Sequence, residues 1–402
     1  MSANADFRAI AEKHLYGNYR QAPFVLEKGR GCEVWDVEGN RFLDLCAGVA
    51  VCAVGHAHPK HVAAIAHQAA TLTHVSNWFY NRVNIELADK LAAITGLDRV
   101  LFCNSGAEAI EGLLKLARHH FWGIGKSEKK RLIAFHNAFH GRTMGALSLT
   151  GTPKYREGFG SLEGVTHLPY GDLAAVEAAM GPDVAGILVE PVQGEGGVLP
   201  APEGFLQGLR ALCDAHGALL LLDEVQTGVG RTGSWFGYQH FGVKPDAVAM
   251  AKGLGGGFPI GAFATTEALA GALPPGTHGT TYGGNSLACA SALSVLAIVE
   301  EEKLAEGAAQ KGEFLAKALR AIVEEFPKVC EQERGVGLLR GLVLREGFVA
   351  RDVVPQIFAR GVLVIGAGDR VLRFCPPLVV TEAELAEGIA AVRAVIAELA
   401  AK

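Results

Sequence analysis

Residues 201–228, "APEGFLQGLRALCDAHGALLLLDEVQTG", join a helix pattern to a strand pattern. Apolar residues recur about every 3.6 positions through 201–217, as on one face of an amphipathic helix. Four leucines then lead to the acidic pair Asp223 and Glu224. A short apolar run after such a helix is typical of a strand that is buried on both faces of a parallel sheet. The stretch therefore predicts an α/β fold.

The same alternation of apolar runs and helical patterns extends from residue 100 to residue 265. The apolar runs are "RVLFCNSG", "RLIAFHNAFHG", "VTHLPY", "VAGILVEPVQ", "ALLLLDEVQ", "DAVAMAKG" and "GAFATT". Strands that alternate with amphipathic helices predict a mostly parallel sheet, here with seven strands. Ligands of such sheets bind beyond the carboxyl ends of the strands.

The two ends of the chain have a different pattern. Residues 22–45 predict two hairpin strands around the turn "VEGN". Long helices follow residue 286, and then come short strands and a closing helix over 381–402. We expect the two ends to pack together as a smaller α+β domain. The predicted division is 1–52 and 286–402 for the small domain and 53–285 for the large, ligand-binding domain.

Composition excludes several classes of partner. The net charge is −5, the pI is near 6.3, and no basic cluster is interleaved with aromatic residues, which argues against nucleic acid and against a membrane surface. The first residues lack the basic and apolar regions of a signal peptide, and no apolar run is long enough to span a bilayer. The eight cysteines contain no CxxC pair and suit a reducing compartment. A cytoplasmic protein is expected.

Several apparent motifs fail when their spacing is checked. The histidines of "GHAHPKHVAAIAHQ" follow no zinc pattern, so we predict no metal site. "GIGKS" at 123–127 lacks the earlier glycine of a phosphate-binding loop, and "GLGGG" at 253–257 is followed by Phe258 where a dinucleotide fingerprint needs glycine. A nucleotide-binding or dehydrogenase-like protein that reuses these glycine loops stays the alternative from another class.

Four predicted strand ends carry residues suited to chemistry. In "CNSGAEA", Ser105 is a helix N-cap and Glu108 completes a capping box. The backbone N–H groups of Ser105, Gly106 and Ala107 would then be free at a helix N-terminus, which suits a phosphate. Capping boxes are common, so this motif alone predicts only the start of a helix.

The other three strand ends supply an aromatic ring, charged groups and an amine. "HNAFHGRT" offers Phe139 for stacking and Arg142 as a fork for a carboxylate. "LLLLDEVQTGVGRTG" places Asp223 and Gln226 at the end of the leucine strand. Lys252 follows "AMA", and an amine in such apolar surroundings loses its proton more readily than in water. Taken alone, Lys252 is better explained as a strand-end lysine that reaches solvent.

Together these groups describe a site for pyridoxal 5'-phosphate. A lysine amine can form an imine with the cofactor's aldehyde, and an aspartate can keep its pyridine nitrogen protonated. The helix N-terminus suits the phosphate, and the aromatic residue suits the ring. The lysine amine can also carry a proton between the substrate carbon and the cofactor carbon.

At this point the chain resembles a known family over nearly its whole length. The motifs are "WDVEGNRFLDLCAGVAVCAVGHAHP", "FCNSGAEA", "FHGRT", "EPVQGEGGV", "LLLDEVQTGVGRTG", "AKGLGGGFPIGA", "HGTTYGGN" and "LRFCPPL". They resemble the class III, fold type I, pyridoxal-phosphate aminotransferases, and most closely the acetylornithine aminotransferases. The resemblance implies a large domain with a mostly parallel seven-stranded sheet and a smaller α+β domain.

The resemblance implies a homodimer whose shared active sites hold pyridoxal 5'-phosphate. Lys252 would be the covalent tether of the cofactor, and Asp223 would pair with its pyridine nitrogen. Thr281 would reach the phosphate in the neighbouring subunit. The other implied cofactor contacts are Gln226 near the phenolic oxygen, Phe139 on the ring, and Ser105, Gly106 and Ala107 at the phosphate.

The resemblance also implies the substrate contacts. Arg142 would bind the far carboxylate of either substrate, and Thr280 would touch substrate. Arg373 would bind the α-carboxylate of glutamate, and Glu195 would pair with it when the other substrate is present. The implied reaction moves the δ-amino group of N-acetylornithine to 2-oxoglutarate, in arginine biosynthesis. Succinylornithine, ornithine, a carrier-bound lysine precursor and 4-aminobutyrate stay open as alternative donors.

Four positions depart from what the resemblance leads us to expect. The family often has asparagine in place of Ile110, proline in place of Ser286 and asparagine in place of Cys52. None of these carries cofactor chemistry, so the differences bear on the rim of the pocket. Ornithine aminotransferases would have a tyrosine at Val49, and its absence favours an acylated ornithine or another ω-amine donor.

Overall fold

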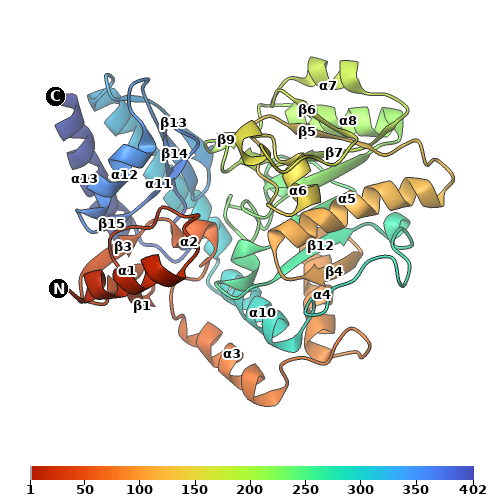
Figure 1. The fold of residues 1–402 in the computed structure, drawn as a ribbon, viewed down its shortest axis with the longest axis horizontal. Helices are drawn as coiled ribbons and strands as arrows, with labels where there is room; N and C mark the ends of the chain where they lie inside the picture. The colour runs from red at the N-terminus through yellow and green to blue at the C-terminus, as the bar shows by residue number, and fades with distance from the viewer. Residues whose placement is uncertain (1) are drawn as a thin grey trace.

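All seven apolar runs become strands of one sheet in the computed structural model, which describes residues 2–402 (Figure 1). The strand order is β4-β12-β11-β10-β7-β5-β6. β12 is antiparallel to both β11 and β4, and the other neighbours are parallel, so the predicted mostly parallel sheet is confirmed. The strands are β4 (Arg99–Cys103), β5 (Arg131–Phe135), β6 (Val165–Leu168), β7 (Val184–Val189), β10 (Leu219–Asp223), β11 (Ala247–Met250) and β12 (Gly261–Thr265).

Helices cover both faces of this sheet, and they connect its strands. They are α3 (Pro59–Thr71), α4 (Arg82–Thr95), α5 (Gly106–Gly123), α6 (Met144–Leu149), α7 (Leu173–Ala179), α8 (Phe205–His216) and α9 (Gly237–His240). Short elements between them are the 3-10 helices η1 (Pro153–Tyr155), η2 (Lys252–Gly255) and η3 (Glu267–Leu269), and the strands β8 (Val192–Gln193) and β9 (Leu199–Pro200).

The leucine strand β10 shows why the sheet needs two helical layers. Successive side chains of a strand point to opposite faces. Leu220 and Leu222 therefore join one core with residues of α8, while Leu219 and Leu221 join another with residues of α5. Burying each leucine stabilises the fold by roughly 2 kcal/mol. The uninterrupted apolar run is the sequence signature of this double burial.

The first residues of the chain pair with a strand from near its end. The hairpin predicted around "VEGN" is formed by β2 and β3, and β1 adds a third strand. β15 lies parallel to β3, with Val362 opposite Leu43 and Leu363 opposite Asp44. Figure 1 shows the red N-terminal and blue C-terminal segments on the same side of the molecule. The elements are α1 (Ala3–His14), β1 (Leu26–Arg30), β2 (Glu33–Asp36), β3 (Arg41–Asp44), α2 (Ala47–Ala50) and β15 (Val362–Leu363).

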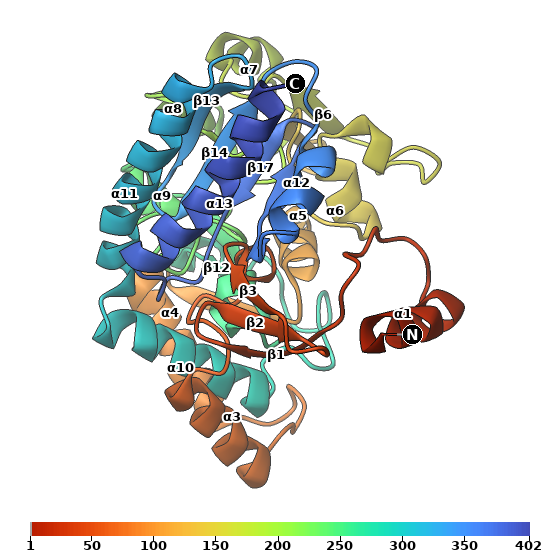
Figure 2. The same ribbon diagram turned by 90° about the vertical axis from the view of Figure 1, so that its left-hand side faces the viewer.

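The C-terminal segment adds an antiparallel sheet with its own helices. The sheet order is β13-β14-β17-β16, and Figure 2 shows α13 between α11 and α12 beside it. α10 packs against α3 and α4 of the preceding segment. The predicted boundaries at 52/53 and 285/286 stay a prediction. The elements are α10 (Ser286–Glu301), α11 (Leu304–Glu325), β13 (Cys330–Val336), β14 (Leu339–Leu344), α12 (Ala350–Phe358), β16 (Ile365–Ala367), β17 (Val371–Phe374) and α13 (Glu382–Ala400).

None of the helices described in residues 2–402 is long and apolar enough to cross a membrane. Within the same residues, no group of three or more histidine, cysteine, aspartate or glutamate side chains is arranged to hold a metal ion. The expectation that the protein carries no metal stays a prediction.

Candidate active site

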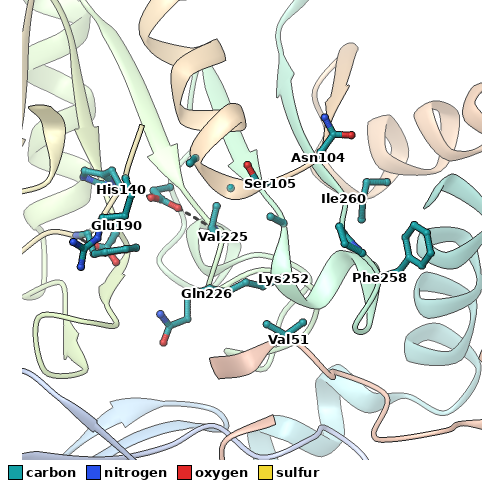
Figure 3. A pocket seen from close by; sticks show the side chains of 18 of the residues that line it. Val51, Asn104, Ser105, His140, Glu190, Val225, Gln226, Lys252, Phe258 and Ile260 are labelled. Atoms are coloured by element: carbon teal, nitrogen blue, oxygen red, sulfur yellow. Dashed lines mark hydrogen bonds and ion pairs between the residues drawn. The ribbon is translucent and has the colours of Figure 1, made fainter. Parts of the chain in front are cut away.

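A pocket of about 460 Å³ lies at the carboxyl ends of the central strands (Figure 3). It brings together predicted site residues from segments that are far apart in the sequence. These are Ser105, Gly106, Ala107, Phe139, Arg142, Asp223, Gln226 and Lys252. The pocket is also lined by residues that sequence reasoning did not assign to the site, among them Val51, Asn104, His140 and Glu190.

Lys252 begins η2, directly after β11 and Ala251, and lies half-buried in the pocket wall. Its φ of 44° is in the left-handed region that side chains other than glycine rarely adopt. Such strained backbone clusters at active sites. Burial lowers the pKa of the amine, and the Arg373 guanidinium lowers it further, while Glu195 and Asp223 oppose the shift. The neutral amine is therefore more accessible at Lys252 than in a surface lysine.

Asp223 ends β10 with a side chain that is only 4% exposed. Its Oδ2 lies 2.8 Å from His140 Nδ1, and its Oδ1 accepts from Val225 N–H at 3.0 Å. The backbone N–H of His140 donates to Thr150 Oγ1 at 3.0 Å, which fixes the backbone that carries the imidazole. Sequence reasoning missed His140, although it stands next to Phe139 in "FHGRT".

Glu190 is a second buried carboxyl group that sequence reasoning missed. It follows β7 and accepts from the N–H groups of Phe139 at 3.1 Å and Gly194 at 3.3 Å. Burial raises its pKa well above the ordinary value, and the Asp223 charge adds to the rise. Burial and the nearby Asp223 charge therefore favour the neutral form of Glu190, while its two N–H donors oppose this. The available signal was its place at the end of an apolar strand, the same pattern that singled out Asp223.

The start of α5 forms one end of the pocket. Ser105 is the predicted N-cap, and its Oγ accepts from Glu108 N–H at 3.2 Å. The Glu108 carboxylate accepts from the Asn104 N–H instead of the Ser105 N–H, so only one half of the predicted capping box forms. The first N–H groups of a helix have no acceptor within it, so those of Gly106 and Ala107 remain for a ligand. A Cβ on Gly106 would lie 2.8 Å from Val225 Cγ1. Glycine is thus needed for the helix to approach the pocket wall this closely.

Arg373 and Glu195 form an ion pair at the edge of the pocket. Arg373 Nη1 donates to Glu195 Oε1 at 2.6 Å and to Gln226 Oε1 at 3.1 Å. Burial opposes ionisation of Glu195, but the Arg373 charge and hydrogen bond outweigh it and lower the pKa of Glu195. The pair is joined to the pocket through Gln226, which lines it.

The two predicted threonines lie in different surroundings. Thr280 Oγ1 accepts from Asn104 Nδ2 at 3.0 Å, and Asn104 lines the pocket. Thr281 is exposed and does not belong to the pocket lining formed by residues 2–402. One chain therefore brings Thr280 to the edge of the site and leaves Thr281 outside it.

A left-handed turn leads from the N-terminal strands into the pocket. Ala47, Gly48, Val49 and Ala50 have φ angles of 47°, 59°, 71° and 61°. Three of them carry a Cβ, and each such residue costs roughly 1–3 kcal/mol. The turn ends at Val51, which lines the pocket. No pattern in the sequence indicated this turn.

The remaining departures lie outside the pocket lining. Ile110 is wholly buried in the core between α5 and the sheet. Ser286 begins α10, is wholly buried, and its Oγ finds no hydrogen-bond partner among residues 2–402. Cys52 is half-buried next to the glycine loop at Gly257.

The fold and this pocket define a class of enzyme. A family model described as aminotransferase class III matches residues 16–396, and the chain belongs to that family. It is 50% identical to the acetylornithine aminotransferase of Myxococcus xanthus over 93% of this chain and 94% of that one. It is 46% identical to the acetylornithine/succinyldiaminopimelate aminotransferase of Yersinia pestis, over 92% of each. The solved ornithine aminotransferase of Toxoplasma gondii is 36% identical, with a TM-score of 0.95 over 99% of this chain and 96% of that one.

The protein is therefore a pyridoxal-phosphate-dependent aminotransferase, and the pocket fits that cofactor. An amine of lowered pKa, a buried carboxylate and a helix N-terminus meet in one cavity, as the cofactor's aldehyde, pyridine nitrogen and phosphate require. When bound, the cofactor supplies an electron sink for negative charge that develops on the substrate carbon.

Proposed function

We propose that this aminotransferase moves the δ-amino group of N-acetylornithine to 2-oxoglutarate, in arginine biosynthesis. The observation that carries the proposal is the Arg373–Glu195 ion pair, which is joined to the pocket of Lys252 through Gln226. A transaminase must accept two substrates of different charge in one site. An arginine whose partner is a carboxylate of the protein can bind a substrate carboxylate in one half-reaction and stay paired in the other.

Each charged residue has its own role in binding the two substrates. Arg142 would bind the carboxylate that lies far from the transferred amine in either substrate, and Thr280 would contact substrate beside it. Arg373 would bind the α-carboxylate of glutamate once Glu195 is displaced. With N-acetylornithine, Glu195 would hold Arg373 instead. Arginine suits these roles because its planar fork binds a carboxylate through two N–H groups.

The buried groups hold the cofactor and move protons. Lys252 would be the covalent tether, and its displaced amine would take the proton from the substrate carbon and return it. Asp223, oriented by His140, would hold a proton on the pyridine nitrogen. Gln226 would lie near the phenolic oxygen, Phe139 on the ring, and Ser105, Gly106 and Ala107 at the phosphate.

The donor assignment has two supports. The relatives of Myxococcus xanthus and Yersinia pestis carry acetylornithine in their names, at 50% and 46% identity. Val49 stands where the family resemblance places a tyrosine in ornithine aminotransferases. Succinylornithine, ornithine, a carrier-bound lysine precursor and 4-aminobutyrate are the competing donors.

A screen of the first half-reaction tests the donor. The cofactor-loaded enzyme is mixed with each amine in turn, and loss of its aldehyde form is followed by absorbance in a single turnover. The highest kcat/KM is expected with N-acetylornithine. A clear preference for ornithine or 4-aminobutyrate would overturn the donor assignment and leave the enzyme class unchanged.

We also propose that the enzyme is a homodimer in which Thr281 completes the partner's phosphate site. Thr281 is exposed, and large apolar side chains are exposed in the same region, with Trp78 at 90%, Tyr80 at 96% and Tyr282 at 63%. Exposed apolar patches of this kind favour an interface.

A mixing experiment tests the shared site. The Lys252→Ala and Thr281→Ala variants are unfolded together, refolded as a mixture and assayed. A mixed dimer has one site with both native residues only if Thr281 acts across the interface. Activity above that of either parent variant is expected, and no gain would contradict the proposal.

We propose a cytoplasmic location. All eight cysteines are free thiols in the structure, and most are buried. Thiols that stay unpaired suit a reducing compartment. Fractionation of the source cells, with activity followed in each fraction, tests the location.

A further inference from the structure

We propose that Tyr155 is a positioning residue that holds the guanidinium of Arg142 ready for a substrate carboxylate. The proposal rests on the binding role given to Arg142 above. Arg142 Cζ lies 4.0 Å from the centre of the Tyr155 ring and 5.5 Å from the centre of the Phe139 ring. The two rings are 6.0 Å apart and almost perpendicular, at 89°. The guanidinium therefore lies against two perpendicular rings, here called the aromatic corner, and Tyr155 is the nearer of the two.

Arg142 depends on this corner because it has no carboxylate partner of its own. Among residues 2–402 its side chain takes part in no ion pair and no hydrogen bond. The carboxylate whose pKa it affects, Glu195, is already bound by Arg373. A long side chain at the exposed rim of a pocket would otherwise sample many rotamers, and binding would have to restrict them.

An aromatic partner differs from a carboxylate partner in one decisive way. The face of a ring attracts a cation without occupying its N–H groups or neutralising its charge. A carboxylate on the protein would have to be displaced by each incoming substrate carboxylate. Tyr155 can therefore orient Arg142 and leave its donor edge free for the substrate.

The surroundings of Tyr155 keep its ring in place. It ends the short helix η1, and its N–H donates to Thr152 O at 3.1 Å. Its side chain is half-buried and lines a second cavity of about 360 Å³, which is also lined by Glu195 and Arg334. Tyr155 thus stands between this cavity and the catalytic pocket that Arg142 lines.

The test compares ring and ringless variants on substrates with and without the carboxylate. Tyr155→Leu removes the ring, Tyr155→Phe keeps it, and Glu157→Gln changes an exposed neighbour two residues further along the chain. Each is assayed with N-acetylornithine and with N-acetylputrescine, which is the same amine without its carboxylate. For Tyr155→Leu we expect KM for N-acetylornithine to rise about tenfold at nearly unchanged kcat, with kcat/KM for N-acetylputrescine unchanged. Tyr155→Phe and Glu157→Gln should match the parent enzyme within about twofold.

Other outcomes overturn the proposal. An unchanged KM for N-acetylornithine in Tyr155→Leu would show that the ring does not position Arg142. An equal loss for both amines, or a loss in Tyr155→Phe, would show a general structural role or a role of the hydroxyl. Tyr155→Met, which is also ringless, gives the same comparison should the leucine variant fold poorly.

The donor assignment can fail without affecting this test. If the parent enzyme does not use N-acetylornithine, the comparison is made with glutamate and with 2-aminobutyrate, which lacks the far carboxylate. A selective rise in KM for glutamate is then expected, and equal effects on both amino acids overturn the proposal.

Discussion

Arg373 Nη1 and Glu195 Oε1 lie 2.6 Å apart, although Arg373 is only 2% exposed and follows Glu195 by 178 residues. The same nitrogen donates to Gln226, and the Nε of Arg373 is buried without a partner among residues 2–402. An unpaired buried donor is costly, so the Nε–H of Arg373 is available to donate to a further partner. Through these hydrogen bonds, the C-terminal strand β17 contacts the pocket that the central sheet forms.

Arg373→Ala should impair the glutamate half-reaction more than the N-acetylornithine half-reaction. Only the glutamate half-reaction would use Arg373 to bind a substrate carboxylate. Loss of such a charge-assisted pair is expected to lower kcat/KM for glutamate about a hundredfold. Single-turnover rates with each amine measure the difference. Arg370→Ala, which removes a half-buried arginine that pairs with Glu331 just before β17 and does not line the pocket, should change neither rate. Equal losses in both half-reactions would contradict the division of roles.

Reducing the holoenzyme with borohydride should fix the cofactor to Lys252. The pKa of this amine is lowered by burial, which makes it the reactive lysine of the pocket. Peptide mass spectrometry is expected to find the added mass on the peptide that contains residue 252. Lys252→Ala should lose both this label and turnover, whereas Lys60→Ala, at the surface, should keep both. Label on any other lysine would refute the assignment.

Gly106→Ala should weaken cofactor binding about tenfold, an estimate that corresponds to roughly 1.4 kcal/mol. The new Cβ would meet Val225 Cγ1 at 2.8 Å and push a residue of the pocket wall. Gly123 at the other end of α5 is the matched control, since a Cβ there meets nothing within 4 Å. Titration of the apo-proteins with cofactor, followed by fluorescence, gives the two affinities. The idea fails if Gly106→Ala and Gly123→Ala bind equally well.

Glu224 should make the fold less stable above neutral pH. Its carboxyl is wholly enclosed and accepts from the N–H groups of Gly237 at 2.8 Å and Tyr238 at 2.7 Å. Burial raises its pKa from 4.5 to about 7, so the folded state binds its proton more tightly than the unfolded state. The free energy of unfolding contributed by this group is complete below pH 4.5 and is lost as pH rises through 7, by about 3 kcal/mol.

Urea denaturation at pH 5 and pH 8 tests this dependence. Between these values the parent protein should lose about 3 kcal/mol more than Glu224→Gln, because other titrating groups are common to both. Glu301→Gln, an exposed carboxylate, serves as the control and should follow the parent. Equal pH dependence in the parent and Glu224→Gln would mean that Glu224 is ionised in the folded protein.

The sheet could be predicted from the sequence because its strands are buried on both faces. In runs such as Leu219–Leu222 both faces of the strand are apolar. The pattern therefore predicts a buried strand whichever helices pack against it. The helix start at Ser105 was equally visible, because an N-cap serine that accepts from the N–H three residues later is a local hydrogen-bond pattern. These elements depend on short stretches of chain, so one sequence is enough to find them.

The parts that escaped prediction depend on partners distant in the sequence. His140 orients Asp223 across 83 residues, and the pKa of Glu190 is raised by its burial and by the charge of that aspartate. Three of the four residues in the left-handed turn at Ala47–Ala50 have no preference for positive φ, so the packing around the turn must stabilise it. Tyr155 was not visible as a neighbour of Arg142, since nothing local brings η1 over that guanidinium.

The parallel pairing of β15 with β3 has a consequence for synthesis on the ribosome. Leu43 and Asp44 are made early, but their strand partners, Val362 and Leu363, leave the ribosome only after most of the chain. The central sheet, which lies between these segments, can fold first, as N-terminal units generally do during translation. The pocket wall around Lys252 can thus form before Arg373 is made. An unfinished chain then has the lysine without the arginine that we propose binds the α-carboxylate of glutamate.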